Sequence, residues 1–322
     1  MRAFALRDVP LVRRRTAVVD ATVPPISGYG AGHRTVASIG AGGGTAVART
    51  RVGEHDGQQR AAVDAATVIV VRDGDAGLEV LVQERHLETD FVGGALVFPG
   101  GRVEDEDRDL DPALWRGGDP ADVGERLGTD ERGGLGLLVA AGRESFEEAG
   151  LLFASHTDGT PVPASLLREA DVAAQRAALA ARDDRGDLAA LLASRGLRLD
   201  LDAYHPFAWW VTPAGMHRRY DTRFFVAAVP EAQVDAATSD HVETTSARWL
   251  TPQACLDGGE SGRFTVIFPT RRVLAELATF DDVGAVLAAA AGRQPERIEP
   301  TIIQRDGAVL VQHPDGSEPE AP

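Results

Sequence analysis

The chain has 322 residues, a formal net charge of −16 and a hydrophobic content of 43%, which is enough apolar material for a large buried core. All 33 basic residues are arginine, so a P-loop lysine, a lysine Schiff base and a lysine nucleophile are excluded. The single cysteine, Cys255, excludes an intrachain disulfide and any multi-cysteine metal site. The acidic balance argues against nucleic acid as a partner, since binding a duplex needs a basic surface.

Residues 1–62 combine the arginine triplet Arg13–Arg15 with a glycine-rich tract from Ser27 to Thr45. We expect a disordered extension or linker here. The apolar run after the triplet is cut by Asp20, which argues against a secretion signal. No apolar run in the chain approaches the roughly 20 residues of a membrane span, so we expect no membrane partner and a cytoplasmic location, and we interpret Cys255 as a core residue.

From Ala66 the pattern changes to that of a folded domain. Residues 67–72 and 78–85 read as two strands on either side of a turn at 73–75, and together they predict a hairpin. The strand that follows breaks at Pro99-Gly100-Gly101 and leads into an acidic loop.

An unusually acidic helix is predicted over residues 136–150. At about 100° per residue, Glu144, Glu147 and Glu148 share one face. Their mutual repulsion is relieved by a hard divalent cation, for which Mg²⁺ or Mn²⁺ is the candidate cofactor; the alternative is an ordinary solvated helix face. Arg143 precedes Glu147 by four residues and is placed to form an ion pair with it.

The remaining elements are predicted from periodicity and from turn residues. They are helices over 164–182, 187–195, 269–279 and 281–291, a helix opened by Thr251-Pro252, strands over 205–213 and 218–229, a strand carrying Trp249, and a hairpin over 298–311.

The Pro-Gly-Gly turn and the acidic helix together resemble the Nudix hydrolase signature, in which a glycine and an acidic residue precede an Arg-Glu-apolar-x-Glu-Glu-x-Gly run. The long insert inside this signature, with the segments at 210–213 and 218–225, is similar to the motif-19-type, coenzyme A diphosphatase-like subgroup. The sequence departs from the pattern where 35 residues, Arg108 to Gly142, replace a short spacer. Asp107 stands where the family usually has a glutamate, and whether it joins the metal site stays open.

The resemblance implies an α/β (α+β) fold, the Nudix α/β/α sandwich with a mixed β-sheet and helical insertions. We expect the hydrolase domain over residues 63–292, with a mainly loop-like insert near 108–138 and a helical insert over 155–204. Residues 293–322 would form a C-terminal hairpin and tail.

The resemblance also implies a phosphoanhydride hydrolase. Glu144 and Glu148 are the first implied metal ligands, Glu147 or Glu243 completes the shell or acts as the base, and Arg143 orients Glu147. Implied substrate contacts are Gly101 and Arg102 beside the turn, with Arg219 and Arg223 from the strand near 220; an ordinary strand face is the alternative for these two.

The implied substrate is a small nucleoside diphosphate derivative. Coenzyme A or acyl-CoA would give 3′,5′-ADP and a phosphopantetheine. The alternatives are a pyrophosphatase for NADH, ADP-ribose or nucleotide sugars, and a nucleotide sensor without turnover. Because Nudix proteins often pair, a homodimer is also compatible with the resemblance.

Overall fold

The computed structural model describes residues 61–85, 94–181, 186–216, 218–240, 242, 244–317 and 319. All of them belong to one compact unit, Thr45–Pro322. The predicted disordered extension falls outside the described residues except for its last two positions. Glu243, predicted as a catalytic residue, also falls outside them.

A mixed sheet forms the centre of this unit. Its strand order is β10-β2-β1-β9-β8-β11, with β3 beside β2 and β4 beside β1. β1 runs parallel to β9 and antiparallel to β2, which confirms the predicted hairpin. The strands are β1 (Val63–Gly74), β2 (Gly77–Arg85), β3 (Leu96–Val97), β4 (Gly100–Arg102), β8 (His205–Val211), β9 (Tyr220–Ala228), β10 (Thr244–Leu250) and β11 (Arg297–Ile298).

One edge of β1 is shared by two strands. Its first part, Ala65–Thr67, pairs with β4, whereas its last part, Val71–Gly74, pairs with β2. β2 and β4 therefore diverge along this edge. The Pro-Gly-Gly turn lies at the divergence, where Pro99 accepts a hydrogen bond from the Val68 amide at 2.8 Å.

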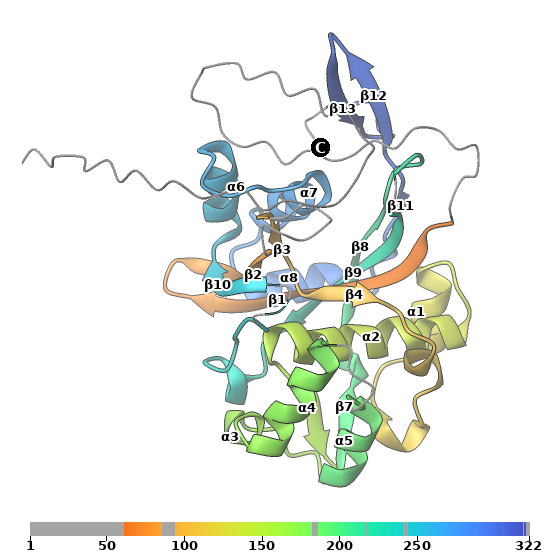
Figure 1. Ribbon diagram of the computed structural model, residues 1–322, viewed down its shortest axis with the longest axis vertical. Helices are drawn as coiled ribbons and strands as arrows, with labels where there is room; N and C mark the ends of the chain where they lie inside the picture. Colours follow the sequence, from red (N-terminus) through yellow and green to blue (C-terminus); the bar gives the residue numbers. More distant parts are fainter. Residues whose placement is uncertain are drawn as a thin grey trace, which may run out of the picture. The chain divides into compact units, whose positions relative to one another are not determined.

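Helices cover both faces of the sheet, as the predicted sandwich requires (Figure 1). Side chains alternate along a strand, so Val68 and Val70 of β1 join the hydrophobic core around α2 (Glu131–Ala149), whereas Ile69 and Val71 join the core on the other face. That second core is covered by α6 (Pro252–Glu260), α7 (Phe268–Leu277) and α8 (Val283–Ala290).

The first insert is more ordered than the predicted loop excursion. It contains η1 (Glu106–Asp109), η2 (Pro112–Leu114), β5 (Trp115–Arg116) and α1 (Pro120–Arg126), and it supplies the first turns of α2. The helix begins at Glu131 rather than near Gly136, with the Asp130 side chain capping the Gly133 amide at 2.8 Å. Glycines of this insert serve helix packing: a Cβ on Gly134 would lie 2.0 Å from the Pro120 carbonyl oxygen of α1.

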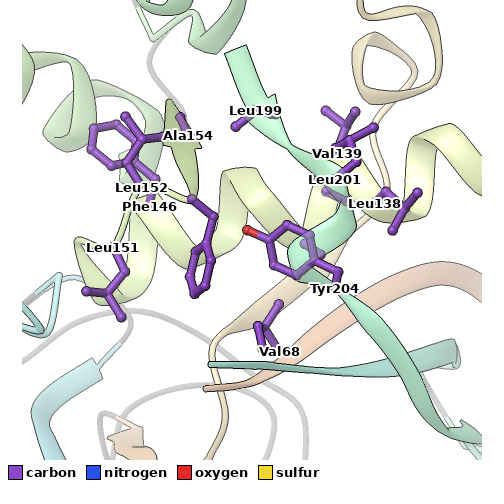
Figure 2. Packing of buried hydrophobic residues seen from close by; sticks show 14 of the residues in the cluster. Val68, Leu138, Val139, Phe146, Leu151, Leu152, Ala154, Leu199, Leu201 and Tyr204 are labelled. Carbon is purple, nitrogen blue, oxygen red and sulfur yellow. The ribbon is translucent and has the colours of Figure 1, made fainter. Parts of the chain in front are cut away.

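The second insert forms a helical layer beside α2. Its helices and strands are β6 (Ala154–His156), α3 (Ala164–Leu167), α4 (Ala170–Ala180), α5 (Leu188–Arg195), β7 (Leu197–Asp200) and η3 (Leu201–Ala203). Leu188, Leu191 and Leu192 are buried, which confirms that the leucines of this insert form a packing surface. Figure 2 shows Leu199 and Tyr204 in the same buried core as Phe146 of α2.

Beyond β9 a short η4 (Glu231–Gln233) precedes β10, and β12 (Thr301–Arg305) with β13 (Ala308–Gln312) forms the predicted C-terminal hairpin. Cys255 is fully buried, and burial raises the pKa of its thiol to about 12, so its interpretation as a core residue is confirmed. Within the described part of the chain, no helix has the length and apolar character needed to cross a membrane.

Candidate active site

The three glutamates predicted to share a helix face do lie together. Glu144, Glu147 and Glu148 are each 7–8% exposed and line one cavity of about 850 Å³. They reach it where β2 and β4 diverge, because the C-terminal half of α2 contacts β4 there. Three carboxylates thus face a cleft large enough for a nucleotide-sized ligand.

The two glycines after Pro99 bring backbone close to these carboxylates. The Gly100 amide donates a hydrogen bond to Glu148 Oε2 at 2.9 Å. A Cβ on Gly101 would lie 2.2 Å from Glu144 Oε1. Gly101 therefore leaves room for the Glu144 carboxylate, and the Gly100 amide fixes the Glu148 carboxylate. This gives a physical reason for the two glycines of the signature.

Arg143 holds the cluster together. Its Nη1 donates to Glu147 Oε1 at 3.0 Å, the predicted ion pair, and to Glu144 Oε1 at 2.7 Å. Nε and Nη2 of Arg143 donate hydrogen bonds to the two carboxylate oxygens of Asp107 at 2.9 and 2.8 Å, and Nη2 also donates one to the Arg102 carbonyl oxygen. Because its donors are engaged by protein groups, Arg143 positions carboxylates rather than presenting itself to the cavity.

Among the residues that the structure describes, this cluster sets three carboxylates against one guanidinium. Asp107, Glu144 and Glu147 all contact the single Arg143 guanidinium. Burial raises the pKa of Glu144 to about 7, even though Arg143 opposes the shift. The same group of carboxylates raises the pKa of Arg143 well above its usual value against the effect of its own burial.

This donor set fits a hard divalent cation. Among the described residues, no three acidic, histidine or cysteine side chains already surround one point, because Arg143 lies between Glu144 and Glu147 while Glu148 turns to the Gly100 amide. The excess of buried carboxylate oxygens is nevertheless what such a cation neutralises.

Of the predicted substrate contacts, Gly101, Arg102 and Arg219 line the cavity. Arg219 also bonds the Thr212 carbonyl at 3.1 Å and pairs with Glu299. Arg223 requires a correction. It is 4% exposed and points to the α2 side of the sheet, where it pairs with Asp64 at 2.6 Å, whereas its neighbours Thr222 and Phe224 face the cavity.

Sequence reasoning missed much of the cavity wall. Apolar residues from several elements form it, and the strand pattern marked some of them only as core. They include Phe98, Trp210, Phe224, Phe268, Ile302, Val309 and Val311.

Arg176 of α4 is a second residue that the sequence did not single out. It donates to the Glu147 and Glu148 carbonyl oxygens, each at 3.0 Å, and to the carbonyl and hydroxyl oxygens of Thr238 at 2.9 and 2.8 Å. The Glu147 and Glu148 carbonyls belong to the last turn of α2, which ends at the left-handed Gly150. The second insert thereby ties the end of α2 to the loop that precedes β10.

The chain is similar to known proteins in both sequence and structure. The sequence profile of the NUDT19 Nudix domain matches residues 121–269. Acyl-coenzyme A diphosphatase NUDT19 of Gallus gallus is 26% identical over 77% of this chain and 75% of its own length. The crystal structure of a NUDIX hydrolase from Alicyclobacillus acidocaldarius has a TM-score of 0.55 and 26% identity, covering 71% of this chain and 96% of the other. These matches support a Nudix hydrolase of the NUDT19 type.

Human NUDT19 also matches, with 26% identity over 69% of this chain and 66% of its own length. The predicted fold and enzyme class, a phosphoanhydride hydrolase, are confirmed. Nudix hydrolases generally use a divalent metal, in agreement with the charge excess on α2.

Proposed function

We propose that this Nudix hydrolase uses Mg²⁺ to cleave coenzyme A or an acyl-CoA into 3′,5′-ADP and the matching phosphopantetheine. The observation that carries the proposal is the buried carboxylate cluster of α2, which opens onto a long and largely apolar cavity. The NUDT19 relatives, whose names state acyl-coenzyme A diphosphatase activity, support the choice of substrate.

In this proposal Glu144, Glu147 and Glu148 hold the cation. When bound, Mg²⁺ neutralises the phosphate oxygens and makes the attacking water more acidic. Arg143 and the Gly100 amide keep the carboxylates in place, so little reorganisation is needed when the anionic substrate enters. Arg102, 43% exposed at its side chain beside the turn, contacts phosphate.

Hydrolysis adds one water across the anhydride. The water oxygen forms a bond to one phosphorus, the bridging P–O bond breaks, and the bridging oxygen leaves with the electron pair on the second phosphate. The proton released by the water passes to a carboxylate, for which Glu147 and Glu243 are the candidates.

Product identification tests the proposal directly. The purified enzyme with Mg²⁺ is incubated in turn with CoA, octanoyl-CoA, NADH, ADP-ribose and a nucleotide sugar, and products are resolved by mass spectrometry. We expect 3′,5′-ADP from the two CoA substrates. Cleavage of NADH or ADP-ribose without cleavage of either CoA substrate refutes the substrate assignment, and nucleotide binding without turnover indicates a sensor.

A further inference from the structure

A row of neighbouring residues crosses the cavity floor from the carboxylate end to an apolar end. Arg102 of β4 pairs with Ala65 of β1, Ala65 with Thr222 of β9, and Thr222 with Trp210 of β8. All four residues line the cavity. Three strand spacings of about 4.8 Å place Trp210 about 14 Å from Arg102.

The apolar end is built around Trp210. The ring of Phe268, at the start of α7, meets it edge-on with centroids 5.6 Å apart, and so does the ring of His313, which follows β13. These contacts place the base of the C-terminal hairpin against Trp210. Val311 of β13 belongs to the same buried cluster as Trp210 and Phe268.

The hairpin presents one apolar face to the cavity. Ile302 and Val311 are register partners, and Val309 lies two residues from Val311, so the three side chains share a face. All three line the cavity. Leu310, between the two valines, points to the opposite face and is not among the lining residues.

We propose that this apolar end is an acyl-chain subsite and that the hairpin makes the enzyme prefer acyl-CoA to free CoA; this rests on the proposed function. About 13 bonds separate the diphosphate from the thioester sulfur, and an extended chain advances about 3.5 Å for every three bonds, hence about 15 Å. With the diphosphate beside Arg102, the acyl group therefore reaches Trp210, and the hairpin valines bury its methylenes.

Two opposite changes at Val309 test the subsite. Wild type, Val309→Asn, Val309→Trp and the matched control Leu310→Asn are assayed with CoA, acetyl-CoA and octanoyl-CoA under Mg²⁺. In the wild type, kcat/KM is expected to be at least about tenfold higher for octanoyl-CoA than for CoA, mainly through KM, because several methylenes are buried. Both Val309 variants should lose that preference, whereas Leu310→Asn should keep it and should retain turnover of CoA within about twofold of the wild type.

The outcomes separate this inference from the proposed function. If the wild type cleaves CoA and octanoyl-CoA equally well, or if Leu310→Asn and Val309→Asn reduce the preference alike, the acyl subsite is refuted and the diphosphatase activity stands. If the wild type cleaves no CoA substrate at all, the proposed function itself fails. A thermal unfolding midpoint close to that of the wild type shows that each variant is folded.

Discussion

Two largely buried arginines, Arg143 on α2 and Arg223 on β9, each contact carboxylates on the same side of the sheet, yet the two clusters differ in charge. Arg223 contacts Asp64 and Asp221, Asp64 is also bound by Arg108 at 2.7 Å, and Asp221 lies 3.8 Å from Arg297, so three bases compensate two acids. Arg143 alone contacts three acids, with Glu148 close by on the same helix face.

The difference in compensating charge distinguishes the Arg223 cluster, a structural ion-pair network, from the Arg143 cluster at the candidate active site. Burial alone would raise the pKa of Asp64, but Arg108 and Arg223 outweigh it and lower that pKa. At Glu144 the single shared arginine does not compensate, and the pKa rises to about 7. The compensated cluster stabilises the fold, whereas the excess of carboxylates in the acidic cluster fits the divalent cation of the proposed function.

The largest effect is expected from removing one charge of the acidic cluster. Glu148→Gln keeps the size of the side chain and an oxygen that can accept the Gly100 hydrogen bond, but it loses the negative charge. We expect kcat/KM to fall by about 10³, roughly 4 kcal/mol of transition-state stabilisation. Steady-state kinetics measures it, with the exposed Glu131→Gln of the same helix as control. Unchanged turnover in Glu148→Gln refutes the site assignment.

The Arg223 cluster should show the reverse behaviour, a loss of stability without a loss of activity. Arg223→Met leaves Asp64 and Asp221 with less compensation, and we expect about 2 to 3 kcal/mol lower unfolding free energy in urea, below the range for fully buried pairs because Asp64 is 37% exposed. Its kcat/KM should stay within about threefold of wild type.

Two comparisons control the Arg223 result. Removing the exposed Arg132 that pairs with Asp109 should leave the unfolding midpoint unchanged. Because the pKa of Asp64 is lowered from about 3.8, its stabilisation is present above about pH 4 and is lost as the pH falls through its folded-state pKa. Wild type and Arg223→Met should therefore converge in acid. A large loss of kcat in a fully folded Arg223→Met would instead assign this arginine to catalysis.

Two glycine substitutions compare an added Cβ beside the site carboxylates with an added Cβ elsewhere on α2. Gly101→Ala places a Cβ 2.2 Å from Glu144 Oε1, which must move, and we expect about a 30-fold loss of kcat/KM, about 2 kcal/mol. Gly142→Ala meets Leu199 at 3.4 Å, an ordinary contact, and should raise stability by about 0.5 to 1 kcal/mol with normal kinetics. Equal kinetics in both variants would show that the Gly101–Glu144 approach is irrelevant to catalysis.

A smaller effect is expected from the second insert. Arg176→Met removes the hydrogen bonds from α4 to the end of α2 and to Thr238. We expect kcat to fall about tenfold, about 1.4 kcal/mol, with weaker Mn²⁺ binding, because the carboxylates lose part of their support. Arg195→Met, in the same insert but paired with Glu169 at the surface, is the control. Normal Mn²⁺ affinity in Arg176→Met would reduce its role to stability.

The local part of the site could be predicted from the sequence because it depends only on helical spacing. The shared face of Glu144, Glu147 and Glu148, and the pairing of Arg143 with Glu147, follow from positions one to four residues apart. The grip of Arg143 on Asp107 joins residues 36 positions apart, and only the fold of the first insert brings them together.

Two errors have physical causes of the same kind. Strand alternation showed that Arg223 and its neighbours face opposite sides, but not which side holds the cavity. Gly133 and Gly134 lie in the insert predicted to be mainly loop-like, because glycine weakens helices, whereas in the structure they admit α1 and the first insert against α2. In both cases the deciding contact is made by a distant part of the chain.

Calorimetric titration of Mn²⁺ into the wild type, Glu144→Gln and Glu148→Gln at pH 6 and pH 8 tests the central claim most directly. Since a proton must leave Glu144, whose pKa is about 7, before that group binds metal, wild-type affinity should be about tenfold higher at pH 8. Both variants should bind more weakly, and Glu144→Gln should lose most of the pH dependence. Equal affinity in all three proteins at both pH values would contradict the assignment of the α2 carboxylates as the metal site.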